Sequence, residues 1–339
     1  MEASKPGLPL PGPPELVTHA TEAAAAPAQV MAVHENLTDT RIASPLPATL
    51  PSSTVPPVGA AGKAMAKILV LSHEYDLYEH RHFLVQELCA HWAASGHEVI
   101  VHQGASRAPR ADVAILHVDA TVVAPEYLEA LADTPVVVNR ATVDIGKRTY
   151  SQNLVGPFDA WAGPVIVKTN ANSGGIPEWL HESVARERGV PASGPPSRHM
   201  TGRYPIYASF ARVPLELRFD PELVIERFLP ERDPRGYACR HYLFFGDRER
   251  CSRWVGPHAV VKAADAIERK PVEVPDEIRA WRHKLGFDYG KIDFVIHDGK
   301  PVLIDANRTP TLPRGRLTAA VREGTEMLAG GIDAFLRRA

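Results

Sequence analysis

Cysteine is scarce in this sequence. The chain has only Cys89, Cys239 and Cys251, and no two of them have the spacing of a pair. An odd, sparse set argues against a disulfide scaffold and favours a reducing compartment. The simplest interpretation of all three is that they are small buried hydrophobic residues. We therefore predict a cytoplasmic protein.

A strong excess of one charge is also missing. Lys and Arg number 38, Asp and Glu number 40, and the formal net charge is −2. Without a basic excess, a dedicated nucleic-acid binder is not expected. No run approaches the roughly 18 apolar residues of a membrane span. With 45% hydrophobic and 23% charged residues, the 339-residue chain is typical of a globular protein of about two domains.

Aromatic residues are absent from residues 1–63, which hold 11 of the 31 prolines. Such a segment buries too little apolar surface to offset its ordering entropy, so we predict a disordered extension over 1–64. It has no basic start followed by an apolar run, as a secretory signal would. Alternatively, the natural start is Met65, which leads directly into a strand.

Short apolar strands alternate with helical segments over residues 65–140. This order is typical of a small parallel α/β domain. The strands are expected at 67–72, 97–103, 112–118 and 135–139, and the helices at 79–96 and 125–132.

Residues 141–339 are richer in strands and form the second predicted domain. Asp144 is expected to cap a helix over 144–155, and the turn-forming residues of 188–205 indicate a mobile loop. The fold class is therefore α/β followed by α+β. Strands are expected at 163–168, 223–231, 237–247, 248–256, 258–262, 291–298 and 300–307, and a closing helix at 315–338.

Two carboxylates and an amide interrupt the apolar strands of residues 285–311. Asp298-Gly299 predicts a two-residue hairpin turn, which brings Asp293 close to Asp305. Asn307 follows Asp305 by two residues, so both are expected on one face. An oxygen-only cluster suits Mg²⁺. The alternative is solvated side chains at a sheet edge.

Two further segments carry polar residues next to apolar strands. Lys168 ends one strand and is followed by NANSGG, whose backbone N–H groups are a plausible cover for phosphate. In LVIERFLPE, Glu226 and Arg227 interrupt an apolar run that is compatible with a hinge next to a purine. Each signal is unspecific alone.

Together, VIVK with its glycine loop, VIERFLPE and DFVIHDGKPVLIDANRTPT resemble the ATP-grasp superfamily over roughly residues 140–315. The resemblance is to its carboxylate–amine ligases, such as D-alanine–D-alanine ligase and the RimK-type and glutathione-synthetase-like enzymes. It implies an ATP-grasp fold preceded by a small α/β domain, together with ATP and Mg²⁺.

The resemblance also implies roles for individual residues. Asp293, Asp305 and Asn307 would hold Mg²⁺, and Lys147 and Lys168 would contact the ATP phosphates. The loop closing over the γ-phosphate would contain Ser173, Gly174 and Gly175. Adenine would contact Glu226, Arg227 and Leu229, and Asp233 or Glu231 would bind the ribose.

The implied reaction joins a carboxylate to an amine through an acyl phosphate. Arg240, Arg253 and Lys291 are the candidate catalytic cations, with Lys262 a weaker one. Two departures stand out: Asp305 replaces the commoner Glu, and Lys291 replaces an Arg of several relatives. The partners would be small-molecule carboxylate and amine substrates, and dimers are common in the superfamily.

Other functions stay open. A phosphotransferase of the same fold would transfer the γ-phosphate to a hydroxyl, and a nucleotide-binding regulator would not turn over. A glycosyltransferase interpretation of 67–139 leaves 285–311 unexplained. In the first domain, HEYD (73–76), His80, Arg81 and His82 follow the first strand and are candidates for contacting the acceptor. A solvated loop or a zinc site are the alternatives there.

Overall fold

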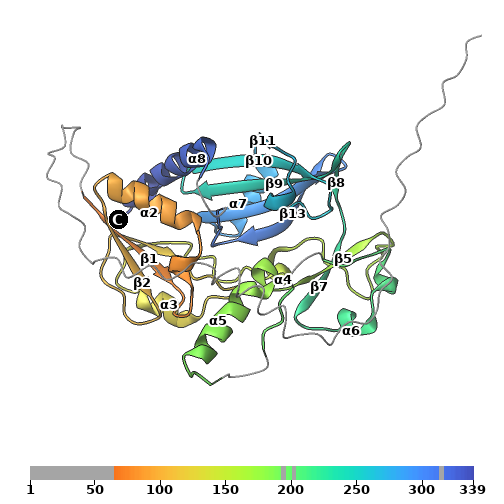
Figure 1. The fold of residues 1–339 in the computed structure, drawn as a ribbon, viewed down its shortest axis with the longest axis horizontal. Helices are drawn as coiled ribbons and strands as arrows, with labels where there is room; N and C mark the ends of the chain where they lie inside the picture. The colour runs from red at the N-terminus through yellow and green to blue at the C-terminus, as the bar shows by residue number, and fades with distance from the viewer. Residues whose placement is uncertain (1–64, 192–195, 201–203, 313–316) are drawn as a thin grey trace, which may run out of the picture. The chain divides into compact units, whose positions relative to one another are not determined.

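The computed structural model describes residues 65–191, 196–200, 204–312 and 317–339. The extension predicted over 1–64 lies outside these residues. Residues 65–339 form one compact unit with three separate β-sheets (Figure 1). No helix within the described ranges has both the length and the apolar character needed to cross a membrane.

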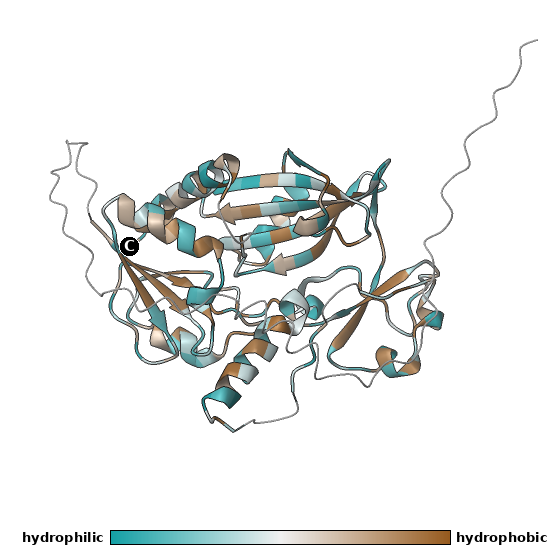
Figure 2. Cartoon of the chain, in the orientation of Figure 1, coloured by the Kyte–Doolittle hydropathy of each residue, from teal (hydrophilic) through white to brown (hydrophobic). Residues whose placement is uncertain are grey.

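The parallel sheet predicted for the first domain is confirmed. Its strands are β1 (Lys67–Ser72), β2 (Glu98–Gln103), β3 (Val113–Leu116) and β4 (Val136–Val138), in the order β2-β1-β3-β4. Successive side chains of a strand point to opposite faces. Ile68 and Val70 accordingly enter one hydrophobic core, and Leu69 and Leu71 enter another. The sheet is therefore covered on both faces, and its strands are mostly hydrophobic in Figure 2.

The helix predicted over 79–96 begins later than expected. A 3-10 turn, η1 (Tyr78–His80), is followed by extended backbone, and α2 spans Leu84–Ala94. The cause is pairing with a distant segment. Phe83 forms an antiparallel bridge with Thr311, and the backbone N–H groups of Leu84 and Leu312 donate to Pro310 and His82. The other predicted helix is α3 (Pro125–Ala130).

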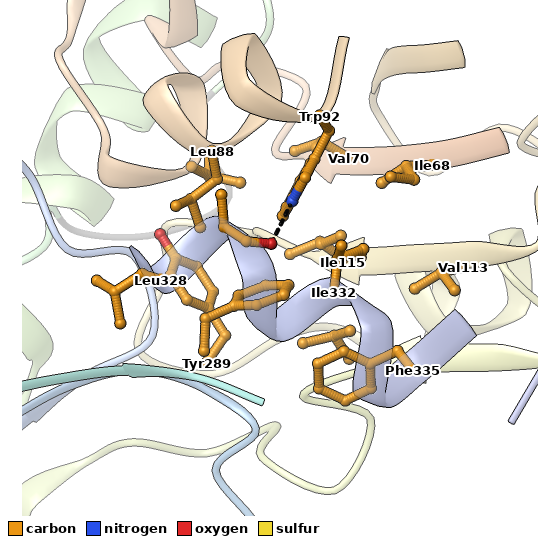
Figure 3. Packing of buried hydrophobic residues seen from close by; sticks show 14 of the residues in the cluster. Ile68, Val70, Leu88, Trp92, Val113, Ile115, Tyr289, Leu328, Ile332 and Phe335 are labelled. Atoms are coloured by element: carbon orange, nitrogen blue, oxygen red, sulfur yellow. Dashed lines mark hydrogen bonds between the residues drawn. The ribbon is translucent and has the colours of Figure 1, made fainter. Parts of the chain in front are cut away.

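The chain end packs onto this first sheet. The closing segment contains α8 (Ala319–Ala329), η5 (Gly330–Ile332) and α9 (Asp333–Leu336). Figure 3 shows the shared core, in which Trp92 of α2 donates from Nε1 to the Ala329 carbonyl at 2.8 Å. Because Ile332 and Phe335 also enter this core, the two predicted domains share buried surface.

A small antiparallel sheet contains β6 (Ile206–Tyr207), β5 (Val165–Thr169) and β7 (Leu223–Arg227), in that order. Two short helical segments, η3 (Phe210–Arg212) and α6 (Leu215–Arg218), lie between β6 and β7 in the chain. Val165, Val167 and Ile225 point into one core. The residues between them therefore face the other way, which matters for the site below.

The largest sheet has β11 (Glu268–Pro271), β10 (Arg248–Gly256), β9 (Gly236–Phe245), β12 (Tyr289–His297) and β13 (Lys300–Asn307) in this order. A short β8 (Glu231–Asp233) also pairs with β9. The predicted turn is confirmed, because Asp298 and Gly299 both have positive φ, 49° and 76°. Helix α7 (Asp276–Lys284) covers one face of this sheet through Ile278.

Two predicted elements are wrong. The helix over 144–155 is limited to α4 (Lys147–Tyr150), because residues 153–155 run beside β7 and exchange backbone hydrogen bonds with it. No strand forms at 258–262. Both sides of the preceding strand β10 are already paired, with β9 and with β11, so this run cannot pair with β10. The 3-10 turn η4 (Ala263–Asp265) follows it.

Two elements after β5 were not expected. The 3-10 turn η2 (Asn172–Gly175) leads into α5 (Ile176–Glu187). The described part of the predicted loop 188–205 contains neither helix nor strand.

Candidate active site

A cavity lies between the three-stranded sheet and the six-stranded sheet. Its walls are the faces that point away from the apolar cores of both sheets. From β5 and β7 come Ile166, Lys168 and Glu226, whose chain neighbours are buried in the core on the other side. From β9, β12 and β13 come the residues His241, Asp293, Val295, Val302, Ile304 and Asp305.

A β-bulge places Asp305 in this cavity. Phe294 pairs with Leu303 whereas Asp293 pairs with Asp305, so Ile304 is the extra residue. A bulge shifts the alternation of side chains by one position. As a result Val302 and Asp305 both face the cavity, although they are three residues apart, and Leu303 and Ala306 face the opposite core. The predicted closeness of Asp293 to Asp305 is confirmed, and the bulge makes the two residues direct partners.

Asp293 is held between two basic side chains. Its Oδ1 lies 2.7 Å from Nδ1 of His241, and its Oδ2 lies 2.8 Å from Nζ of Lys291. Burial opposes ionisation of this carboxyl, but the Lys291 ammonium and His241 outweigh burial and hold the pKa of Asp293 well below its usual range. Burial also opposes the charge of Lys291, yet Asp293 raises the pKa of that ammonium. Asp293 is therefore an ionised carboxylate at neutral pH.

Asp305 contacts a lysine and a tyrosine. Its Oδ1 accepts a hydrogen bond from the Tyr150 hydroxyl at 3.0 Å and lies 3.5 Å from Nζ of Lys147. Lys147 is buried and also donates to the Ala171 carbonyl at 2.8 Å. Burial and the nearby Asp305 raise the pKa of Tyr150 well above its ordinary value, so the phenol remains a hydrogen-bond donor.

Lys168 and Glu226 form a buried ion pair in the wall of the cavity. Nζ of Lys168 lies 2.6 Å from Oε2 of Glu226, and it also donates to the Ile304 carbonyl at 3.1 Å. Oε1 of Glu226 is buried and has no hydrogen-bond partner among the described residues. A buried carboxylate oxygen without a partner is costly, so this atom is available to a ligand donor.

The rest of the cavity is mainly apolar. Leu229 and Arg227, both predicted to contact adenine, line it. Arg227 also pairs with Asp159 at 3.3 Å and lies over the Trp161 ring. Further apolar lining comes from Phe228, Pro230, Ala238, Val260 and Val261. One end of the cavity thus suits a flat apolar ring, and the other end carries the charged groups.

Four of the predicted site residues do not line the cavity and instead bind one another. Arg240 makes two hydrogen bonds to Glu231, at 2.9 and 3.0 Å. Arg253 donates to Glu231 at 2.7 Å and to Asp233 at 3.0 Å. The acidic partners of the predicted catalytic cations are thus the residues predicted to bind ribose. In this arrangement the four side chains form a structural ion-pair network beside the cavity.

The predicted phosphate loop adopts an unusual backbone. Ser173, Gly174 and Gly175 all have positive φ, 47°, 73° and 78°. A Cβ on Gly174 would lie 2.6 Å from the Met200 carbonyl oxygen, and one on Gly175 would lie 2.3 Å from that of Arg198. These residues pack against residues 198–200 and do not line the cavity.

Asn307 and Lys291 lie next to the cavity rather than in its wall. Oδ1 of Asn307 accepts from the Thr309 backbone N–H at 2.8 Å and from Nδ2 of Asn172 at 3.4 Å. The structure therefore brings together two of the three predicted metal residues, and the third lies two positions further along the same strand.

The oxygen donors of the cavity fit a magnesium ion whose remaining ligands are oxygens of a bound phosphate and water. Asp293 and Asp305 present hard carboxylate oxygens from adjacent strands, and Mg²⁺ usually takes one or two carboxylates and completes its shell with phosphate and water. Among the described residues, no three His, Cys, Asp or Glu side chains converge on one point. The two carboxylates would hold the ion and Asn307 stands beside them.

Several residues of the site were missed from sequence. His241 lines the cavity, packs at 4.3 Å against Trp254, and has a buried Nε2 without a partner in the described part of the chain. Tyr150 and Tyr204 were missed as well. The only sequence signal for His241 is its place in the middle of an apolar strand, which does not predict a contact with a residue 52 positions away.

The polar residues after β1 have separate contacts. Arg81 pairs with buried Asp119, and His82 pairs with Glu87 at 2.7 Å. His73 stacks on His181 of α5 with ring centroids 3.8 Å apart. The alternative of a zinc site has no support in these contacts, because each side chain has a different partner.

No protein-family model matches this chain, and no curated protein sequence is significantly similar to it. Among solved structures it resembles ATP-grasp ligases, the superfamily that its motifs resemble. For the ligase PsnB complexed with minimal precursor, the identity is 14%, the coverage is 80% of this chain and 99% of that chain, and the TM-score is 0.45.

Two further solved structures have a similarly low sequence identity to this chain and a similarly high coverage. For D-alanine–D-alanine ligase from Bacillus anthracis complexed with ATP, the identity is 14%, the coverage 80% and 98%, and the TM-score 0.43. For a RimK domain ATP-grasp protein from Sphaerobacter thermophilus, these values are 15%, 80% and 100%, and 0.41.

Proposed function

We propose that this protein is a cytoplasmic ATP- and Mg²⁺-dependent ligase of the ATP-grasp type that joins a carboxylate to an amine. One observation carries the proposal. A cavity between two antiparallel sheets has an apolar end for a flat base, and a charged end where Lys147 pairs with Asp305, Lys168 pairs with Glu226, and Asp293 also lines the wall. Cations for phosphate and carboxylates for a metal are thereby combined in one cavity.

Both lysines that line the cavity have a carboxylate partner that a phosphate oxygen would replace. Lys168 would exchange its contact with Glu226 for a contact with a phosphate oxygen. Lys147 would likewise exchange its contact with Asp305 for a phosphate oxygen. Glu226, with its unpartnered Oε1, would then accept a hydrogen bond from the base. Asp293 and Asp305 would hold Mg²⁺, which would offset the charge of the transferring phosphoryl group.

The reaction follows from these groups. A substrate carboxylate oxygen bonds to the γ-phosphorus while the bond to the β-phosphate oxygen breaks, which gives an acyl phosphate and ADP. The amine nitrogen then bonds to the acyl carbon, the carbon–oxygen bond to phosphate breaks, and the amine loses a proton. Lysine ammonium groups at 147, 168 and 291 would stabilise the negative charge in both steps. Homodimer formation is proposed from the superfamily resemblance alone.

Binding of ATP with Mg²⁺ to the full chain, measured by calorimetry, tests the proposal. We expect Asp305→Asn and Lys168→Gln to lower the affinity at least about tenfold, because each removes a charge that faces the triphosphate. Asp298→Asn is the matched control. It makes the same change in the same hairpin, but at a 93% exposed side chain outside the cavity, and Asn tolerates the positive φ of that turn.

Turnover separates the ligase from the alternatives. A panel of carboxylic acids is tested with hydroxylamine as the amine, and hydroxamate, ADP and inorganic phosphate are measured. Hydroxamate together with ADP supports the ligase. A stable phosphorylated product indicates a phosphotransferase, and nucleotide binding without ADP across the panel indicates a regulator. A parent protein that does not bind nucleotide overturns the proposal.

A further inference from the structure

The loop that follows β3 contacts two distant parts of the proposed nucleotide site. This loop, Val118–Thr121, stands at the carboxyl end of β3, an inner strand of the first sheet. Residues at such ends commonly face a ligand site in an open α/β sheet. Here they instead contact the end of β13 and the beginning of α5. We call the segment Val118–Thr121 the β3 loop.

The first contact is with the residues that follow Asn307. Arg308 is fully buried, and its guanidinium donates to the carbonyls of Ala120 at 2.6 Å and Val118 at 3.4 Å. The Thr309 hydroxyl donates to Oδ1 of Asp119, whose other oxygen pairs with Arg81. Asp119 and Thr309 are each 1% exposed. The Thr309 backbone N–H then fixes Oδ1 of Asn307.

The second contact is with the glycine turn, Asn172–Gly175. The backbone N–H of Asn172 donates to the Thr121 hydroxyl at 2.7 Å, and the Thr121 N–H donates to Glu178 of α5 at 2.6 Å. Asn172 and Thr121 are both buried. Asp119 and Thr121 are only two residues apart. One short loop therefore fixes both the end of β13, which carries the predicted metal residues Asp305 and Asn307, and the start of the glycine turn.

We propose that the β3 loop positions two halves of the nucleotide site: Asp119, acting through Thr309, orients Asn307 beside the metal carboxylates, and Thr121 orients the glycine turn that the superfamily resemblance assigns to the γ-phosphate. This inference rests on the proposed function. Asp119, Thr121 and Thr309 are positioning residues, because none of them lines the cavity. Partners behind a metal ligand are typically worth 10- to 100-fold in metal affinity.

Replacing a threonine by valine keeps its shape and removes only the hydroxyl. Thr309→Val frees the Asp119 oxygen and loosens the segment that fixes Asn307. We expect the Kd of ADP with Mg²⁺ to rise about tenfold, and the Kd of ADP without metal to stay as in the parent. Thr309→Ser keeps the hydroxyl and should behave as the parent.

Thr121→Val removes the acceptor for the Asn172 N–H. Since the glycine turn is assigned to the γ-phosphate, we expect the Kd of ATP with Mg²⁺ to rise about tenfold while that of ADP with Mg²⁺ changes less than about twofold. Thr121→Ser is the matched control. The two valine variants therefore have opposite signatures, which a general loss of stability would not produce.

Calorimetry on the full chain with ADP and ATP, with and without Mg²⁺, decides the question. The two separate signatures, each absent from the serine variant, support the proposal. Valine variants that bind like the parent, or that weaken every ligand equally, overturn it and leave the proposed function standing. If Thr309→Val does not fold, Thr309→Ala is used, because it also removes the hydroxyl that donates to Asp119, and the same metal-dependent loss is expected. A parent that binds no nucleotide overturns both.

Discussion

Lys168 and Glu226 make a prediction about stability at the level of single residues. Both side chains are buried, 10% and 3% exposed, so removing one partner leaves the other charge without compensation. We expect Glu226→Gln to lower the free energy of unfolding by about 3 kcal/mol. The double variant Lys168→Met/Glu226→Leu should be much closer to the parent, because neither charge remains. Urea unfolding followed by circular dichroism measures both.

The exposed pair Arg107–Asp133 is the control for this prediction. Its side chains are 82% and 42% exposed, and solvent screens such a pair, so Arg107→Gln should cost much less stability than Glu226→Gln. If Glu226→Gln and Arg107→Gln lower the free energy of unfolding equally, the buried pair contributes no more to stability than the exposed pair.

Individual site residues differ in how far sequence can predict them. The closeness of Asp293 and Asp305 was predictable from the two-residue turn, but their direct pairing was not, because it depends on the bulge at Ile304. The contact between Arg240 and Glu231 was not predictable either, since alternation predicts the face of a strand and not the partner on it. His241, Asp119 and Thr309 depend on contacts between segments far apart in the chain, which no local pattern indicates.

The glycine turn before α5 makes a prediction at the level of an element. Gly175 has φ 78°, and a Cβ there would lie 2.3 Å from the Arg198 carbonyl oxygen. Gly175→Ala therefore adds a steric clash to the cost of a left-handed backbone. We expect a loss of about 2 kcal/mol or more in the free energy of unfolding. Urea unfolding is again the measurement.

Gly189 is the matched control for this substitution. Its φ is 79°, almost the same, but a Cβ at this position would have nothing within 4 Å. Gly189→Ala should therefore cost only the backbone term, about 1 kcal/mol. If Gly175→Ala is no worse than Gly189→Ala, the close packing of the turn against residues 198–200 is not rigid.

The elements themselves were predicted unevenly. Buried parallel strands such as β1 are continuous apolar runs and were found at their observed bounds. Helix α5 was missed although Pro177 and Glu178 in its first turn are start signals. Strand β11 was missed because it is an exposed edge strand, ERKP, with no apolar alternation. The failed strand at 258–262 shows the converse, since an apolar run is not a strand unless another strand pairs with it, and its neighbour β10 is already paired on both sides.

Two buried histidines, one half-buried histidine and one aspartate couple the stability of the whole molecule to pH. Burial lowers the pKa of His73 to about 3, with His181 adding to the effect. Burial, with nearby Arg81, lowers the pKa of His117 to about 3 and that of His181 to about 4. Burial, together with Asp119, raises the pKa of Asp76 to about 7. These residues come from both predicted domains, so the effect belongs to the compact unit as a whole.

Unfolding should become easier as the pH falls from 7 to 5. Near pH 5.5 the unfolded chain binds a proton at each of the three histidines and the native chain binds none there, whereas Asp76 binds a proton only in the native chain. The unfolded state thus binds about two more protons, and the free energy of unfolding should fall by roughly 2 to 3 kcal/mol per pH unit. Urea unfolding at several pH values measures this slope.

His181→Phe keeps a ring against His73 but cannot be protonated. The free energy of unfolding of this variant should therefore change with pH by about 1.4 kcal/mol per pH unit less than that of the parent. A slope unchanged by His181→Phe would mean that this histidine is protonated in the folded protein.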